Sequence, residues 1–338
     1  MVLLGTAGGA FPKSTRAGYA NAVVVGDAVY LVDCGEGVHS QLWRAGLAMS
    51  ARFGRERPVV RAVFVTHLHA DHIMDLGNLL LGSWPSQPVD IYGPAPAGIP
   101  IPGFRPGVSP AFPDEPTPGM RATTDLLLRS FAYNINVRLA GEGRSTVIDR
   151  VRVHEIGVSG GPSPVEVSLG VVADASSPGA AAPAMDPVVI YPEDDHGVQV
   201  SAILVQHAPV FPALGFRFDT PQGSIVFSGD TGHCDNVARL AQGADLLVHE
   251  VIHLDRMTVR LRRLPNFEEV RDQLASSHSS PDQVGDVARR AGVGTLVLSH
   301  LVPGDVEVTE DEWEALVRPH FEGEVVCGVD LDEFALKR

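Results

Sequence analysis

The chain has 338 residues, of which 44% are hydrophobic and 20% charged, and its 26 basic and 41 acidic side chains give a formal net charge of -15. This length can form a large core in one or two domains. The acidic balance argues against a protein whose main task is non-specific binding to nucleic acid or anionic membranes. The three cysteines are too few and too scattered for a disulfide framework or a Cys-x-x-Cys zinc site.

The first residues lack the basic segment and the long apolar segment of a signal peptide. No apolar run approaches the ~18 residues of a membrane span. The sequence therefore predicts a soluble, cytoplasmic protein without a membrane partner.

The N-terminal part predicts short strands with glycine turns, followed by helices that alternate with strands. Two β-branched runs joined by Gly26-Asp27 indicate a β-hairpin. The predicted strands are 2–5, 22–25, 29–32, 62–65 and 89–92, and the predicted helices are 38–46 and 73–81.

The middle of the chain is less regular. Residues 94–118 are dense in proline and glycine, which disfavours regular elements. Thr123-Thr124-Asp125 predicts the N-terminus of a helix over 126–139. A loop at 157–164 and a low-complexity stretch at 176–187 flank a strand-like run at 165–172. We interpret roughly 94–195 as an insertion that contains a helix, so that 1–338 form a single domain.

The alternation of strands and helices returns after this insertion. The predicted strands are 200–205, 215–218, 224–227, 244–248 and 295–298, and the predicted helices are 236–241, 281–291 and 310–318. Strand groups in both halves with helices between them favour an α/β fold with two mixed sheets face to face and helices outside. This is a four-layer αβ/βα sandwich.

The strongest chemical signal is the run His-Leu-His-Ala-Asp-His at 67–72, directly after a predicted buried strand. Imidazoles with a carboxylate are a ligand set for zinc, manganese or iron. His207, Asp230 and His300 each follow another apolar strand. Because strand ends at one edge of a sheet converge in space, these residues and the 67–72 loop can supply ligands for two metal ions that share Asp230.

This set of motifs resembles the metallo-β-lactamase superfamily and, within it, the ribonuclease Z and arylsulfatase-like branch. Leu-Gly-Thr at 4–6, Val-Asp-Cys-Gly-Glu-Gly at 32–37 and Leu-Val-His-Glu at 247–250 are further matches. The resemblance covers nearly the whole chain except the insertion.

The resemblance implies a site with two divalent ions, most simply zinc, with manganese or iron as alternatives. A hydroxide held between them would attack an ester. Asp33 is expected to brace a ligating histidine, and Asp71 to orient the hydroxide as well as to bind metal. The implied ligands are His67, His69 and His207 for one ion and Asp71, His72 and His300 for the other, with Asp230 bridging both.

In ribonuclease Z, the glutamate of a His-Glu-Ala-Thr motif pairs with a distant histidine that protonates the leaving oxygen. Here the motif is half matched, as His249-Glu250-Val251-Ile252, and the partner resembles His278. Such a pair suits a general acid, because the carboxylate keeps the imidazole protonated. Alternatively, His278 is only part of the segment before the helix at 281–291, and His253 is a weaker candidate.

Ribonuclease Z binds tRNA with a flexible arm between the third ligand histidine and the bridging aspartate, whereas His207 and Asp230 are only 23 positions apart. The insertion before His207 has few basic residues, so tRNA is disfavoured as a partner. The sequence therefore favours a dinuclear metal-dependent phosphodiesterase acting on a small ester substrate. The alternatives are a hydrolase of carboxylic esters, lactones or aryl sulfates at the same site, and a metal-binding scaffold without turnover. A homodimer is expected by analogy alone.

Overall fold

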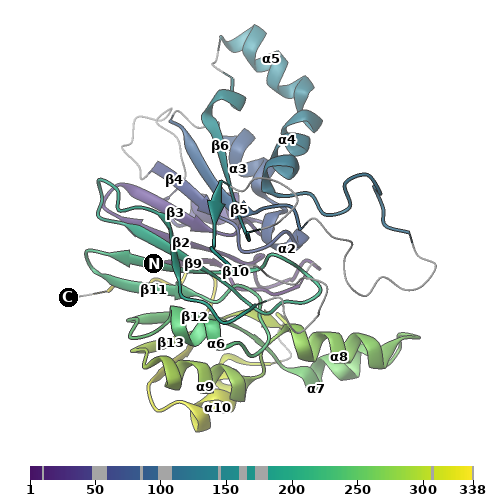
Figure 1. Ribbon diagram of the computed structural model, residues 1–338, viewed down its shortest axis with the longest axis vertical. Helices are drawn as coiled ribbons and strands as arrows, with labels where there is room; N and C mark the ends of the chain where they lie inside the picture. The colour runs from purple at the N-terminus through teal and green to yellow at the C-terminus, as the bar shows by residue number, and fades with distance from the viewer. Residues whose placement is uncertain are drawn as a thin grey trace.

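The computed structural model describes residues 1–9, 11–47, 59–83, 87–97, 109–143, 146–159, 166–171, 182–305 and 308–336. Figure 1 shows two sheets packed face to face, with helices on the outer surface of each. Each sheet contains seven of the described strands. The predicted four-layer αβ/βα sandwich is therefore confirmed.

The first sheet keeps its strands in sequence order. Its members are β1 (Val2–Gly5), β2 (Ala20–Val25), β3 (Ala28–Val32), β4 (Val59–Phe64), β5 (Val89–Pro94), β6 (Val151–Gly157) and β7 (Val167–Ser168). The first three strands pair antiparallel, and β2 and β3 form the predicted hairpin around Gly26-Asp27. From β3 to β7 the pairing is parallel, so the carboxyl ends of these strands lie at the same edge.

The second sheet runs in the order β14-β13-β12-β11-β10-β9-β8. Its members are β8 (Val188–Tyr191), β9 (Gln199–Leu204), β10 (Leu214–Thr220), β11 (Gly223–Phe227), β12 (Leu246–Ile252), β13 (Thr295–Val302) and β14 (Glu324–Cys327). The strands β8 to β11 are antiparallel and β11 to β14 are parallel. All seven residues of β12 are buried, as expected for a parallel strand that is covered on both faces.

The helices lie outside the two sheets. They are α1 (Val38–Arg44), α2 (Ala70–Ile73), α3 (Leu76–Ser83), α4 (Met120–Ser130), α5 (Ala132–Glu142), α6 (Asp235–Leu240), α7 (Leu254–Leu261), α8 (Phe267–Ser277), α9 (Pro281–Ala291) and α10 (Glu310–Val317). In Figure 1, α3 and α4 flank the first sheet, while α6, α9 and α10 flank the second. None of the described helices is an apolar segment of the length that a bilayer requires.

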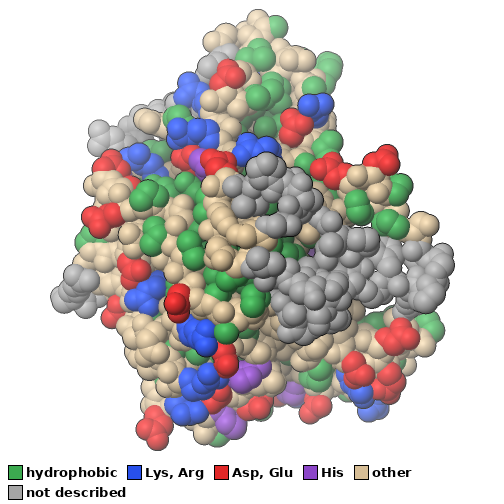
Figure 2. Space-filling model, viewed as in Figure 1, with side chains coloured by type: hydrophobic (Ala, Val, Ile, Leu, Met, Phe, Trp, Pro, Cys, Tyr) green, Lys and Arg blue, Asp and Glu red, His purple; other side chains and the backbone are tan. Residues whose placement is uncertain are grey.

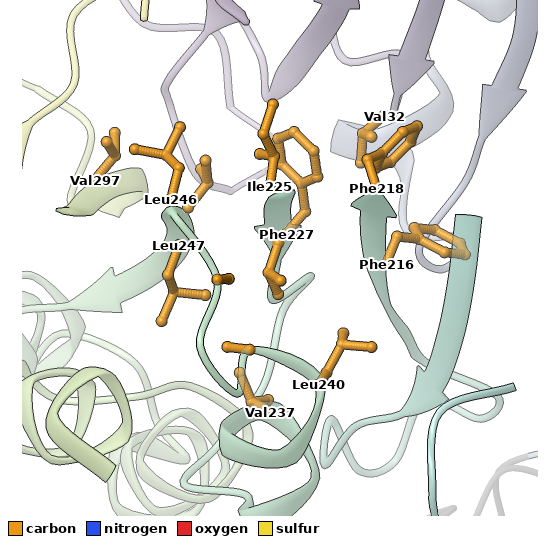
Figure 3. Close-up of a cluster of buried hydrophobic side chains, with 14 of the residues drawn as sticks. Val32, Phe216, Phe218, Ile225, Phe227, Val237, Leu240, Leu246, Leu247 and Val297 are labelled. Carbon is orange, nitrogen blue, oxygen red and sulfur yellow. The ribbon is translucent and has the colours of Figure 1, made fainter. Parts of the chain in front are cut away.

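The main hydrophobic core lies between the two sheets. Figure 3 shows Ile225 and Phe218 of the second sheet pointing toward the first, whereas Leu247 points toward α6. This is the alternation of faces expected along strands. One continuous cluster of buried side chains extends from Leu3 in β1 to Cys327 in β14, and on this basis we propose that the chain is a single domain.

The helix predicted over 126–139 differs in detail, because the structure has two helices there. The first begins earlier than predicted, at Met120, and Phe131 separates α4 from α5 with φ -101° and ψ 16°. The side chains of Leu127 and Phe131 lie against Gly77 of α3. The break between α4 and α5 therefore lies where this segment packs against α3, and such a contact cannot be predicted from helical periodicity.

The segment 94–195 contributes to both sheets, with β6 and β7 extending the first and β8 forming the edge of the second. These strands were not predicted, apart from the run at 165–172, of which β7 occupies two residues. The helices α7 and α8 and the strand β14 were also missed. The proline-rich residues 98–108, most of the loop at 157–164 and the first part of the 176–187 stretch lie outside the described residues.

Candidate metal centre

The seven predicted ligands lie where strands of both sheets end. The 67–72 run follows β4 and continues into α2, His207 follows β9, Asp230 follows β11, and His300 lies near the end of β13. Their donor atoms form groups in which all members lie within 4.8 Å of one another. The topology thus brings together residues that are far apart in the sequence, as expected at the carboxyl edge of parallel strands.

The first group contains His67, His69, His207 and Asp230. The Nδ1 atom of His69 is 3.0 Å from Nε2 of His67 and 3.3 Å from Nε2 of His207. Oδ2 of Asp230 is 3.8 Å from Nε2 of both His67 and His207. Zinc–nitrogen bonds of about 2.0–2.1 Å in a tetrahedral site place neighbouring donors roughly 3.3 Å apart. This spacing therefore fits a zinc-sized ion.

The second group contains Asp71, His72 and His300. The Nε2 atoms of His72 and His300 are 3.2 Å apart. Oδ2 of Asp71 is 3.4 Å from Nε2 of His300 and 3.7 Å from Nε2 of His72. Oδ1 of Asp230 is 3.4 Å from His72 and 3.3 Å from His300. The two carboxylate oxygens of Asp230 thus face different groups, which is the arrangement of a bridging ligand.

Two buried polar atoms of these groups have no hydrogen-bond partner among the described residues. They are Oδ1 of Asp230 and Nδ1 of His300. A buried carboxylate oxygen without a partner is costly, and a cation next to Oδ1 of Asp230 would remove that cost. The donor set, its spacing and this unpaired oxygen all fit divalent metal ions.

The protonation equilibria of two of the imidazoles, those of His67 and His207, also favour metal binding. Burial lowers the pKa of His67 well below its usual value and that of His207 to about 3, so both imidazoles are neutral at pH 7. Neutral imidazole is the form that ligates metals. Burial acts to raise the pKa of Asp230, but the imidazoles of His300 and His72 hold it well below its usual range. The bridging position therefore carries a negative charge.

Hydrogen bonds outside the groups fix the orientation of the imidazoles. As predicted, Asp33 braces a histidine: its Oδ2 lies 2.9 Å from Nδ1 of His72. The backbone N–H of Thr66 donates to Oδ1 of Asp33 at 2.7 Å. Nδ1–H of His207 donates to the carbonyl of Ser277 at 2.8 Å. In both histidines the remaining Nε2 atom is the one that faces the donor group, as in metal sites whose ligands are oriented by outer contacts.

Three residues that support the donor groups, Gly8, Gly9 and Tyr19, were not predicted from the sequence. The backbone N–H of Gly9 donates to Oδ2 of Asp71 at 2.9 Å, and a Cβ atom on Gly8 would lie only 2.7 Å from Nδ1 of His300. The ring of Tyr19 packs against His72 and His300 with centroid distances of 5.4 and 5.3 Å. The adjacent glycines after the first strand were an available signal, whereas Tyr19 stands in no recognisable motif.

The predicted partners Glu250 and His278 are in contact beside the donor groups. Nδ1 of His278 is 3.0 Å from Oε1 of Glu250, which also accepts the backbone N–H of Thr231 at 2.9 Å. The His278 ring lies 5.1 Å from that of His207 and 6.0 Å from that of His300. Burial alone would lower the pKa of His278, but the Glu250 carboxylate raises it to about 9. The imidazole is therefore protonated at neutral pH.

Comparison with known proteins bears directly on this geometry. The sequence profile described as "Metallo-beta-lactamase superfamily" matches residues 15–300. The chain belongs to this superfamily. As a metallo-β-lactamase superfamily member with the donor groups described above, it is a metal-dependent hydrolase that acts on ester bonds.

The relatives of this superfamily member include two mycobacterial proteins named Ribonuclease Z. The protein of Mycobacterium bovis is 34% identical over 331 residues, which cover 98% of this chain and 96% of the relative. That of Mycobacterium marinum is 33% identical over 332 residues, with the same coverage. The structure of human tRNase Z, short form, superposes with a TM-score of 0.58 at 22% identity, covering 99% of this chain and 98% of that one. At that identity the likeness shows a shared fold.

The weaker candidate His253 lies apart from the donor groups. It precedes α7, and its Nε2 atom is 3.9 Å from Glu312. Cys34 and Cys234 are buried without a disulfide, in line with the expectation that they are small buried residues. None of these three side chains belongs to a metal-binding group among the described residues.

Proposed function

We propose that this protein hydrolyses phosphodiester bonds in RNA at a centre of two divalent metal ions. The observation that carries the proposal is the contact between Glu250 and His278 beside the two donor groups. The relatives named Ribonuclease Z support RNA as the substrate class. They lend no support to the small ester that the sequence favoured, and tRNA is again a candidate partner.

In this proposal each donor group would hold one ion, and the Asp230 carboxylate would contribute an oxygen to each group. A set of imidazoles and carboxylates suits zinc best and also accommodates manganese or iron, so zinc is the proposed metal. When bound, such a pair of ions supplies an activated water as nucleophile and neutralises charge that develops on the phosphate. The proposed ligands are His67, His69 and His207 for one ion and Asp71, His72 and His300 for the other.

The surrounding residues keep these ligands in place. The Asp33 carboxylate accepts the Nδ1 proton of His72, which directs the Nε2 lone pair toward the centre. The N–H of Gly9 binds Oδ2 of Asp71 and so limits rotation of that carboxylate. An ordered carboxylate at this place can also orient the attacking water, the second role proposed for Asp71.

His278 is proposed to donate a proton to the leaving oxygen. Its Nδ1 atom is bound to Glu250, so its Nε2–H is the group available to a substrate. An alkoxide, which is the leaving group in RNA, needs such a proton, whereas an activated aryl leaving group does not. The pair therefore favours phosphodiesters over the alternative aryl sulfates and activated carboxylic esters.

The test compares substrates on one metal-reconstituted preparation whose metal content is counted. The substrates are an RNA stem-loop with a 3′ extension and the nitrophenyl phosphodiester, sulfate and carboxylate. We expect about two metals per chain, cleavage of the RNA and preference for the phosphodiester among the nitrophenyl compounds. Preference for the sulfate or the carboxylate without RNA cleavage would contradict the proposal and favour the alternative, a hydrolase of carboxylic esters, lactones or aryl sulfates.

Two of the sequence-based predictions remain to be checked in solution. The cytoplasmic location suits an enzyme of RNA and would be checked by cell fractionation. The homodimer would be checked by light scattering at several protein concentrations.

A further inference from the structure

The helices α7 and α8 form a hairpin that projects from the sandwich beside the proposed metal centre (Figure 1). It begins directly after His253 and ends at His278, whose side chain lies at the centre. Helix α7 has no buried residue, and in α8 only Ser277 is buried. The hairpin is therefore an exposed arm whose base is attached to the site.

Helix α7 and the turn that follows it carry a net positive charge, although the chain as a whole is acidic. Four arginines and one aspartate lie within residues 254–264, although the whole chain has 26 basic and 41 acidic residues. Figure 2 shows basic and acidic side chains together around this projection, at the lower right. On α8, Glu268 and Asp272 are both paired with Arg271, at 2.8 and 2.7 Å. The local basic excess therefore belongs to α7 and its turn.

Two of the four arginines fasten α7 to the body of the protein. Arg256 pairs with Glu312 of α10 at 3.0 Å, and Arg260 pairs with Asp305 at 2.7 Å. The latter contact attaches the helix to the loop that follows His300. These two side chains therefore act mainly on the placement of the arm.

The other two arginines, Arg262 and Arg263, lie in the turn at the tip of the arm. Both are exposed, and their side chains form no ion pair with any residue that the structure describes. The 11 residues of α8 separate the turn from His278, a distance of roughly 16 Å at 1.5 Å per residue. Charges that far from the reacting bond contact only a substrate that extends well beyond it.

Between the arm and the centre lies a further basic side chain. Lys13 lines a cavity of about 200 Å³ together with Asp71, and its ammonium interacts electrostatically with Arg260 and Asp305. Basic side chains thus occur at the tip of the arm and again at the edge of the proposed centre, where Lys13 lies near Asp71.

We propose that the α7–α8 arm binds the backbone of an RNA substrate, with Arg262 and Arg263 contacting phosphates distant from the bond that is cleaved. The proposal rests on the proposed RNA phosphodiesterase function and assigns it a binding surface. Because the chain as a whole repels polyanions, a local basic surface would supply the attraction that its net charge does not. This surface would also give an extended RNA an advantage over a small phosphodiester.

The test uses the full-length, metal-loaded double variant Arg262→Gln/Arg263→Gln. Its control is Arg289→Gln/Arg318→Gln, which removes two arginines of similar exposure, 60% and 61%, from α9 and the segment after α10. Binding of a labelled RNA stem-loop with a 3′ extension is measured by anisotropy over a range of salt concentrations. Turnover of bis(p-nitrophenyl) phosphate and the molar mass by light scattering are measured on the same samples.

For the arm variant we expect RNA binding about tenfold weaker at low salt, and a slope of log K against log salt smaller by roughly 1.5–2. Turnover of the small phosphodiester should stay at the wild-type level, and the control should resemble wild type in all respects. RNA affinity and salt slope equal to those of the control would overturn the proposal. So would a change from dimer to monomer with unchanged RNA binding, which would make the arm an interface between copies.

These measurements distinguish a result that contradicts the RNA-binding role of the arm from one that contradicts the proposed function. RNA cleavage by wild type together with an unaffected arm variant would contradict only the arm. Wild type that turns over the small phosphodiester but neither binds nor cleaves the stem-loop would contradict both the arm and RNA as substrate. The phosphodiesterase centre would remain in that case.

Discussion

The proposed metal centre and the α7–α8 arm adjoin each other, yet they are built in opposite ways. The donor residues are mostly buried, and outer hydrogen bonds such as that between Asp33 and His72 hold them. The arm has almost no buried residue, and ion pairs with the body attach it at Arg256 and Arg260. The centre is therefore expected to determine whether any ester reacts, and the arm to determine which substrate is bound. Mutations should separate these two functions.

The largest effect is expected at the bridging carboxylate. Asp230→Ala removes the oxygens that face both donor groups, so turnover of RNA and of bis(p-nitrophenyl) phosphate should both be abolished, with loss of bound metal. Metal analysis and turnover on the same sample check this. His69→Ala should behave alike, whereas Asp235→Ala, at an exposed acid in the first turn of α6, should stay near wild type. Normal activity of Asp230→Ala with full metal content would contradict the ligand assignment.

The next largest effect is expected at the proposed proton donor. His278→Ala should lower RNA cleavage by about 10²–10⁴-fold, the usual contribution of a general acid, and affect bis(p-nitrophenyl) phosphate far less. Glu250→Gln should show the same pattern more weakly. The matched control is His253→Ala, which removes a nearby imidazole outside the donor groups.

Two outcomes would count against that role. Equal losses for both substrates would show that His278 is not the acid. Loss of metal from the variant would instead make His278 a ligand, since its donor atom also lies within 4.8 Å of those of Asp230 and His300.

A smaller effect should follow from crowding the centre at the glycine turn. In Gly8→Ala the new Cβ would lie 2.6 Å from Val302 and 2.7 Å from His300, so the imidazole must shift. A displaced supporting contact typically costs about 10–100-fold in metal affinity or activity, which a metal titration would measure. Gly141→Ala in α5 is the control, because nothing lies within 4 Å of its added Cβ. Wild-type metal affinity of Gly8→Ala would mean that His300 tolerates this shift.

The smallest effect is expected in the second projecting hairpin, α4–α5. Figure 2 shows hydrophobic side chains together with basic and acidic ones around this projection at the top. Tyr133 of α5 is 85% exposed. Tyr133→Ser should leave RNA binding unchanged and alter the free energy of unfolding by no more than about 0.5 kcal/mol. Anisotropy and denaturant unfolding check both expectations. Weaker RNA binding in this variant would remove the contrast between the hairpins.

Much of the site could be predicted because its signals are local. The dense 67–72 run and the apolar strands that precede His207 and Asp230 can be recognised without knowledge of the fold. The pairing of Glu250 with His278 needed the family resemblance, and the structure places the two side chains in contact. The family resemblance implies a tRNA-binding arm only between His207 and Asp230, so the hairpin between Glu250 and His278 was not predicted.

Other elements were missed although parts of them carry local signals. The strands β6 and β8 contain β-branched residues, but the proline- and glycine-rich stretches around them favoured the interpretation of the whole segment as an insertion. Helix α7 carries three charged residues and buries none of its side chains, and it was missed although Leu254, Met257 and Leu261 recur at helical spacing. Phe131 divides a helical pattern at the point where it packs against α3.

The sequence by itself determined the sandwich class, the donor types and their positions at strand ends, because strand periodicity and ligand chemistry are properties of short segments. Only the tertiary structure decided which oxygen of Asp230 faces which histidines, that Asp33 binds His72, and that Gly8 and Tyr19 lie against His300. It alone also placed the arginines of α7 beside the site. Those relations depend on how two sheets from distant parts of the chain align, and that alignment is set by packing across the whole core.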